Sequence, residues 1–232
     1  MTNVYCVPGT MCNEVLWQDV MSYLPDHMSI KHVVIPDQGS IAEMVSGILK
    51  QLPSTPVNLL GFSLGGYLLS EIARVAPERI NAAIVLSNSA GALPENEKQQ
   101  RLQALQWVSQ VGYRGIPIKK AKAMLAPINA QNDRLVEKIV AMDKALGQEA
   151  FVAQLQATIE RQNNTTAIAR SGCKWLVLAG LADQFVTAES LNQLAQFDNV
   201  SVNVVAQSGH MLPLEQPKWV ASKMTNFFNC SD

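Results

Sequence analysis

A serine, a histidine and an aspartate each follow a strand-like run in this chain. These three residue types can act together in acyl transfer. Ser63 lies in the stretch Gly-Phe-Ser-Leu-Gly, between Gly61 and Gly65, with an apolar run before it and a helical pattern behind it. The chain must turn there within about one residue, and flanking glycines leave room for the crowded backbone. This context favours Ser63 as a nucleophile over a small residue at a buried turn.

His210 is the predicted general base. A serine hydroxyl is a weak nucleophile at neutral pH and needs a base within hydrogen-bond reach. The chain has three histidines, and His27 and His32 flank a polar connection before a strand-like run. His210 instead follows the last strand-like run, and in a parallel sheet that loop emerges at the same carboxyl edge as Ser63. By elimination, His210 is the base.

Asp183 is the predicted partner of His210. An imidazole that accepts a proton needs an acid to hold its tautomer and to stabilise the imidazolium. Asp183 follows the run Trp-Leu-Val-Leu-Ala-Gly, at the carboxyl end of a predicted strand, whereas Asp198 precedes its strand. Asp37 is the alternative carboxylate, and its place in a loop before the serine favours a structural role.

Strand and helix patterns alternate over much of the chain. Ser40 and Glu43 form a capping box before one apolar helical face, and Pro77 ends a second face that begins at Leu64. The alternation predicts an α/β fold with a mostly parallel central sheet and helices on both faces. The predicted strands are Val4–Val7, His32–Ile35, Val57–Gly61, Ala82–Ser87, Trp175–Gly180 and Val200–Ala206. The predicted helical faces are Ile41, Val45, Ile48 and Leu52, then Leu64, Leu68, Ile72 and Val75.

Residues 93–164 break this alternation. Apolar positions there recur at helical spacing, and no strand pattern occurs between them. We therefore predict a helical cap over 93–164, inserted into a core domain formed by 1–92 and 165–232. The alternative is that these helices are ordinary crossovers that pack on the sheet.

The order Ser63, Asp183, His210 is the order of the α/β-hydrolases. The chain resembles that superfamily over nearly its whole length, through the segments PGT, GFSLGG, APERI, LAGLADQFV and SGHMLPLEQP. It is most similar to the small capped esterases and C–C hydrolases. The resemblance implies the α/β-hydrolase fold, a small-molecule ester or acyl substrate, and no cofactor. A C–C hydrolase, a thioesterase, a lactonase and a non-catalytic ligand-binding protein remain as alternatives.

The oxyanion of a tetrahedral intermediate needs two backbone N–H donors. Leu64 follows the nucleophile at the positive end of its helix and supplies the first. The resemblance places the second at Thr10, with Met11 as the alternative. Many relatives carry histidine where this chain has Pro8, which cannot brace the loop through its side chain. We expect the Thr10 hydroxyl to take over that bracing.

An apolar substrate pocket is predicted at Met11, Trp107 and Phe151, although plain core or helix packing also explains each of them. Arg161 and Gln162, near the end of the cap segment, are interpreted as a solvated helix end in preference to a grip for a substrate carboxylate.

Composition restricts the partners and the compartment. Hydrophobic residues make up 48% and charged residues 16% of the 232 residues, and the net charge is −1. Without a basic stripe, nucleic acid and anionic membranes are not expected partners. The four cysteines show no ligand spacing, so we expect no metal site and reduced thiols. No secretory signal is recognised, which favours the cytoplasm, and the oligomeric state is left open.

Overall fold

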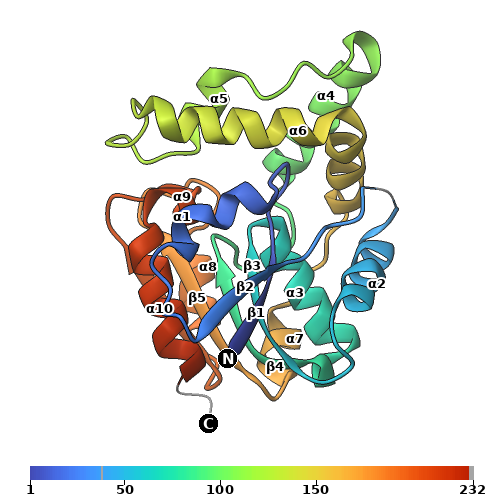
Figure 1. Ribbon diagram of the computed structural model, residues 1–232. Helices are drawn as coiled ribbons and strands as arrows, with labels where there is room; N and C mark the ends of the chain where they lie inside the picture. Colours follow the sequence, from blue (N-terminus) through green and yellow to red (C-terminus); the bar gives the residue numbers. More distant parts are fainter. Residues whose placement is uncertain (38, 230–232) are drawn as a thin grey trace.

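Six parallel strands form the centre of the molecule, in the order β2-β1-β3-β4-β5-β6. The computed structural model describes residues 1–37 and 39–229. Because every neighbouring pair is parallel, all six carboxyl ends meet at one edge (Figure 1), and the predicted α/β sheet is confirmed. The strands are β1 (Thr2–Val7), β2 (Met28–His32), β3 (Val57–Phe62), β4 (Ile80–Leu86), β5 (Lys174–Gly180) and β6 (Val200–Val205).

Each face of the sheet carries its own apolar core. Successive side chains of a strand point to opposite faces, and the neighbours Leu59 and Leu60 accordingly belong to different buried clusters. The Leu60 face is covered by η1 (Glu14–Trp17), α1 (Gln18–Met21), α9 (Leu212–Glu215) and α10 (Pro217–Asn229). The Leu59 face is covered by α2 (Ile41–Gln51), α3 (Leu64–Val75), α7 (Thr165–Arg170) and α8 (Ala188–Leu194).

The helix boundaries around α2 and α3 follow the predicted signals. The Ser40 hydroxyl accepts from the Glu43 N–H, and Glu43 accepts from the Ser40 N–H at 2.7 Å, so the capping box is present. α3 ends at Val75, and the short helix η2 (Pro77–Arg79) follows. Val75 itself is exposed, so its predicted place on the buried face is wrong.

The second strand lies earlier in the chain than the predicted run His32–Ile35. β2 pairs with β1 over Met28–His32. Beyond it, the Val34 N–H donates to Gln51 Oε1 at 2.9 Å and its carbonyl accepts from Gln51 Nε2 at 2.7 Å. The backbone thus bonds to a side chain of α2 instead of extending the sheet. Val33 is buried in the core beside α2, which explains why the run looked strand-like.

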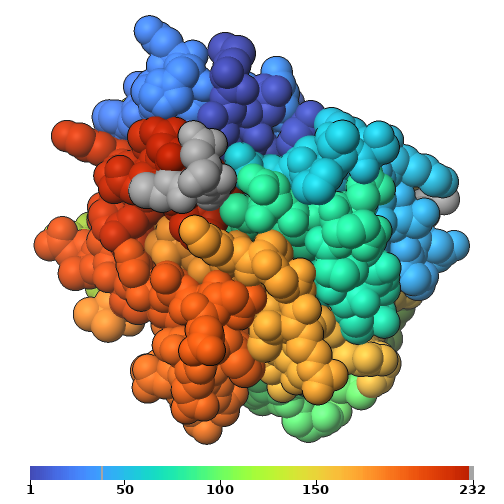
Figure 2. All heavy atoms as spheres, turned by 90° about the horizontal axis from the view of Figure 1, so that it is seen from below, coloured from blue at the N-terminus to red at the C-terminus, as the bar shows by residue number. Residues whose placement is uncertain are grey.

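Residues 87–173, all of which the structure describes, contain four helices and no strand. They are α4 (Glu95–Val111), α5 (Ile118–Ala123), α6 (Asp133–Thr158) and α7. α4, α5 and α6 lie together beyond the carboxyl edge of the sheet (Figure 1), and from the opposite end their light green to yellow segment reaches only the rim (Figure 2). Gly147, with φ 74°, bends α6 where the sequence predicts a helix end. Ala121 and Ile139 join the same buried cluster as Leu60, so this segment packs on the core.

Candidate active site

Ser63 occupies a sharp turn between β3 and α3. Its backbone has φ 50° and ψ −112°, in the left-handed half of conformational space that L residues rarely adopt. A Cβ added to Gly61 would lie 2.6 Å from the Gly65 backbone, and one added to Gly65 would lie 2.2 Å from the Val7 carbonyl oxygen. Only glycine fits at either position, which is the crowding the sequence pattern predicts.

Three side chains meet at this turn. The Nε2 atom of His210 lies 3.0 Å from Ser63 Oγ, and its Nδ1 lies 3.0 and 3.1 Å from the carboxylate oxygens of Asp183. An ionised carboxylate only accepts hydrogen bonds, so Nδ1 carries the proton and Nε2 accepts from the Ser63 hydroxyl. The Asp183 side chain is fully buried and that of His210 is nearly so. The structure thus brings together the three residues that the sequence analysis selected.

Backbone contacts hold the two supporting side chains in place. The Phe185 N–H donates to Asp183 Oδ1 at 2.9 Å, and the Phe185 ring meets the His210 imidazole edge-on at 4.8 Å. The His210 N–H donates to the Met124 carbonyl at 2.8 Å. The histidine loop is therefore anchored to the connection between α5 and α6.

Glu215 ties the same two loops together, and the sequence analysis missed it. Its Oε1 accepts from the Gly209 N–H at 2.8 Å, and its Oε2 accepts from the Ala126 N–H at 2.7 Å and from Asn129 Nδ2 at 2.9 Å. Glu215 lies within the quoted segment SGHMLPLEQP, but Ala126 is 89 residues away, and no local pattern signals such a contact.

The other histidines and carboxylates make no contact with Ser63 or His210 in the described part of the chain. His32 has its Nε2 atom 4.0 Å from Glu14, and Asp37 is exposed in the loop before α2. Asp198 is exposed just before β6, at the opposite end of the sheet. The structure favours neither carboxylate as a partner for His210.

Two unengaged backbone donors lie on the elements that flank Ser63, since a Cβ added to Gly9, the residue before Thr10, would lie 3.1 Å from Ser63 Cβ. Leu64 opens α3, and Thr10 lies in the loop after β1; within residues 1–37 and 39–229 neither N–H has a hydrogen-bond partner. The Met11 N–H, in contrast, donates to Gln154 Oε1 of α6 at 2.9 Å. Thr10 therefore remains the predicted second oxyanion donor, because the alternative at Met11 is already engaged.

Cys12 braces this loop where the sequence analysis expects the Thr10 hydroxyl. The Cys12 thiol donates to the Thr10 carbonyl at 3.5 Å, and the Cys12 N–H donates to the Gly9 carbonyl at 3.1 Å. The Thr10 hydroxyl has no partner among the described residues, so that expectation is wrong. Burial raises the pKa of the Cys12 thiol to about 12; a backbone hydrogen bond with Gly9 opposes this rise, and the charge of Asp143 adds a smaller rise.

The predicted pocket residues have different surroundings. Met11 is buried, whereas the Phe151 ring stacks on Tyr113 with centroids 4.3 Å apart. Trp107 is 64% exposed on α4, so the structure does not place it in an enclosed pocket. For Met11 and Phe151 the role in binding substrate stays a prediction.

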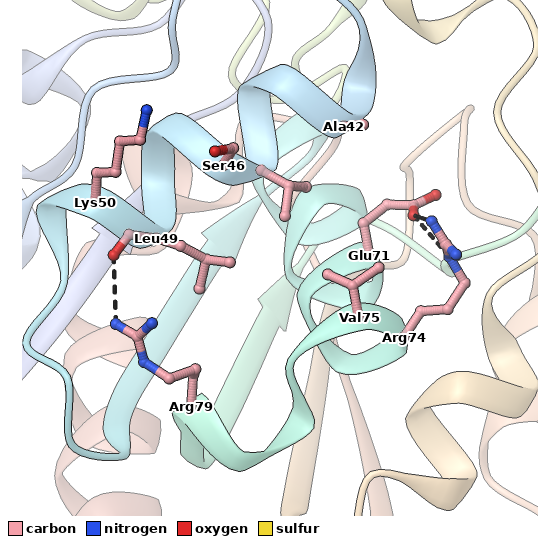
Figure 3. Close-up of a pocket in the computed structure, with 9 residues that line it drawn as sticks. Ala42, Ser46, Leu49, Lys50, Glu71, Arg74, Val75 and Arg79 are labelled. Carbon is pink, nitrogen blue, oxygen red and sulfur yellow. Dashed lines mark hydrogen bonds and ion pairs between the residues drawn. The ribbon is translucent and has the colours of Figure 1, made fainter.

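A cavity of about 430 Å³ lies away from these residues, between α2 and α3 (Figure 3). On its rim, Arg79 donates to the carbonyls of Leu49 and Pro53 at 3.3 and 2.6 Å, and Arg74 forms a 2.7 Å ion pair with Glu71. Arg79 thus bonds to carbonyls at and just beyond the end of α2, which is a structural role.

In the described ranges, no group of three His, Cys, Asp or Glu side chains is placed to hold a metal ion, and no helix there could span a membrane. Cys6, Cys12 and Cys173 are free and buried, and Cys230 lies outside the described residues.

The sequence profile of the alpha/beta hydrolase fold matches residues 36–217. The chain belongs to this family. Over 96 residues, the alpha/beta hydrolase is 31% identical to the pimeloyl-[acyl-carrier protein] methyl ester esterase of Pectobacterium carotovorum. That match covers 38% of this chain and only 37% of the relative's length.

Solved structures share the fold of this alpha/beta hydrolase over its whole length. A thermophilic esterase from Thermogutta terrifontis, with malate bound, superposes with a TM-score of 0.87 at 21% identity, covering 100% of this chain and 90% of that one. MenH from S. aureus superposes with a TM-score of 0.76 at 16% identity, covering 99% and 94%. At these identities the likeness shows the fold, and function must be argued from the site.

Proposed function

We propose that this alpha/beta hydrolase is a serine hydrolase that cleaves carboxylic esters. The observation that carries the proposal is the continuous line of contacts from Asp183 through His210 to Ser63, with 3.0 Å at each step. This arrangement activates a serine for attack on an acyl carbon. The Pectobacterium relative is named as an ester hydrolase, which supports esters as the substrate class.

The proposed reaction proceeds in two halves. Ser63 Oγ attacks the ester carbonyl carbon while His210 Nε2 takes its proton, and Asp183 stabilises the imidazolium. The N–H groups of Leu64 and Thr10 bind the oxyanion. When the tetrahedral intermediate collapses, the acyl–oxygen bond breaks and His210 gives its proton to the leaving alcohol. His210 then deprotonates a water molecule, which attacks the acyl carbon. When this second intermediate collapses, the bond to Ser63 Oγ breaks, His210 returns the proton to Oγ, and the acid is released.

We also propose that residues 93–164 act as a cap on a core domain of residues 1–92 and 165–232. Two contacts support this division. Gln154 of α6 accepts from the Met11 N–H beside the proposed oxyanion donor, and the Met124 carbonyl accepts from the His210 N–H. The loop after β1 and the loop that carries His210 therefore both form hydrogen bonds to the proposed cap.

Hydrolysis of p-nitrophenyl acetate tests the proposed roles. In Ser63→Ala and His210→Ala we expect kcat to fall by about a thousandfold or more, because nucleophile and base act as a unit. His27→Ala is the matched control and should leave kcat nearly unchanged. Full activity in Ser63→Ala, or equal losses in the two histidine variants, would contradict the proposal. An inactive wild type would favour a non-catalytic ligand-binding protein.

A further inference from the structure

Two arginine side chains from different elements lie together where the proposed cap meets α3. Arg101 comes from α4, and its guanidinium donates to Thr158 Oγ1. Arg161 follows the end of α6, and its guanidinium carbon lies 5.3 Å above the centre of the Tyr67 ring. Both residues are partly buried and the Nε atom of Arg161 is fully so, which does not fit the interpretation of Arg161 as a solvated helix end.

This pair has almost no hydrogen-bond partners. A guanidinium carries five N–H donors. In the described part of the chain Arg101 uses one of them, Arg161 uses none, and the buried Nε of Arg161 is unpaired. No carboxylate oxygen of the described residues lies within 4.0 Å of either guanidinium, so neither forms an ion pair there.

The nearby carboxylates are engaged elsewhere or lie farther off. Glu71 accepts from Tyr67 Oη at 2.7 Å, from Asn164 Nδ2 at 2.8 Å and from Arg74 at 2.7 Å. These hydrogen bonds lower the pKa of Glu71 although its burial acts to raise it. Glu160 pairs with Lys98, and Glu97 acts on both guanidiniums only through its charge.

Burial of two unpaired cations is unfavourable. The pKa of Arg101 is lowered to about 10, mainly by desolvation and then by repulsion from Arg161, with Glu97 opposing; burial also lowers the pKa of Arg161. Taking a charge out of water is unfavourable unless a partner of opposite sign compensates. Among residues 1–37 and 39–229 no carboxylate pairs with either arginine, which points to an anion supplied from outside.

The pair adjoins the proposed active site on two sides. The Tyr67 N–H donates to the Ser63 carbonyl at 3.1 Å, so the backbone of the residue beneath Arg161 lies about 6 Å along the α3 axis from Ser63. On the other side, Thr158 Oγ1 donates to the Gln154 carbonyl at 2.7 Å, and Gln154 holds the Met11 N–H. The backbone of α3 thus links Ser63 to the ring beneath Arg161, and Thr158 and Gln154 link Arg101 to the loop after β1.

We propose that Arg101 and Arg161 bind a carboxylate at the far end of the substrate, which makes monoesters of dicarboxylic acids the preferred substrate class. The inference rests on the proposed ester hydrolysis at Ser63. Two planar guanidiniums with free N–H donors match the two oxygens of a carboxylate. The aromatic face of Tyr67 supports Arg161 and leaves its in-plane N–H groups available.

Paired substrates test this subsite. Monomethyl adipate and methyl hexanoate have the same chain length and differ in the terminal carboxylate. We expect the wild type to favour the monomethyl adipate, and Arg101→Gln and Arg161→Gln to lose roughly 10- to 100-fold in kcat/KM for it alone, mainly through KM. Arg161→Lys should retain part of the preference. Arg114→Gln removes an exposed cap arginine and is the matched control, without effect.

Equal losses on both esters, or a wild type without preference, would overturn the proposal. Hydrolysis of p-nitrophenyl acetate, followed in parallel, separates this failure from a failure of the ester hydrolase itself. The substrate series should include the shorter monomethyl succinate and the longer monomethyl suberate. A carboxylate at the wrong distance from the ester group cannot reach the arginines, so the wrong chain length should give no gain in kcat/KM.

Ligand binding gives a readout that does not depend on turnover. Adipate should raise the melting temperature of the wild type and not that of Arg161→Gln. Inorganic phosphate at the same concentration is the comparison. If phosphate raises the melting temperature as much as adipate or more, the site is not a carboxylate subsite. No rise in melting temperature with adipate would also contradict the proposal. Without ligand, Arg161→Gln should be at least as stable as the wild type, because it removes a buried unpaired charge. A marked loss of stability would instead indicate a structural role.

Discussion

At the scale of single residues, Cys12 lies two positions after the proposed oxyanion donor Thr10 and supports it through its thiol. With a pKa of about 12, this thiol stays protonated at neutral and mildly alkaline pH. Thiolate is the reactive form of cysteine. We therefore expect the native protein to resist alkylation of Cys12 by iodoacetamide at pH 8.

Peptide mass spectrometry after alkylation measures this directly. The same protein unfolded in urea serves as the control, and there Cys12 should react fully. Rapid labelling of Cys12 in the folded protein would contradict its burial and the bracing role of its thiol.

Residues of the site differ in how far the sequence could predict them. Ser63, Asp183 and His210 stand in short local patterns after strands, so they could be selected before the fold was known. Gln154 contacts Met11 across 143 residues, and nothing in its neighbourhood in the sequence marks it. Contacts of this kind depend on how distant segments pack.

At the scale of elements, α6 reaches the loop after β1 through Gln154. Its Oε1 accepts from the Met11 N–H, and this bond fixes the peptide after Thr10. Gln154→Ala should lower kcat for p-nitrophenyl acetate by roughly tenfold with little change in KM, because a donor that is less well positioned weakens oxyanion binding in the transition state.

Two further variants test whether the hydrogen bond accepted by Gln154 Oε1 is what matters for kcat. Gln154→Glu keeps an oxygen at the same place and should recover most of kcat, whereas Gln156→Ala, on the exposed side of α6, should not affect it. If Gln154→Ala alters KM and kcat alike and Gln154→Glu gives no recovery, Gln154 is only a packing residue.

Elements with strong end signals were predicted closely, whereas the edge strand β2 was not. The capping box of α2 and the bend at Gly147 both lie where the sequence indicates. The predicted second strand was displaced because Val33 is buried and its N–H still donates to the Cys6 carbonyl, whereas Val34 already bonds to Gln51 of α2; apolar runs alone do not mark where pairing stops.

At the scale of the whole molecule, two apolar cores on either side of the sheet hold the strand ends in register. Leu178 of β5 is 0% exposed, whereas Leu181, just beyond that strand, is 74% exposed. Leu178→Ala should lower the free energy of unfolding by about 2–5 kcal/mol, and Leu181→Ala should change it by no more than about 0.5 kcal/mol.

Urea denaturation followed by tryptophan fluorescence measures both variants. Similar losses would contradict the burial difference on which the arrangement of β5 depends. Asp183 follows β5, so a loosened strand should also lower esterase activity in proportion to the unfolded fraction.

The central claim is that Ser63 is a nucleophile activated by His210. Reaction with a fluorophosphonate followed by intact-mass and peptide analysis tests it most directly, because the reagent labels activated serines. We expect one adduct, located on Ser63 in the wild type, and none in Ser63→Ala; His210→Ala should label far more slowly. An unlabelled wild type, or equal labelling of wild type and Ser63→Ala, would contradict the account.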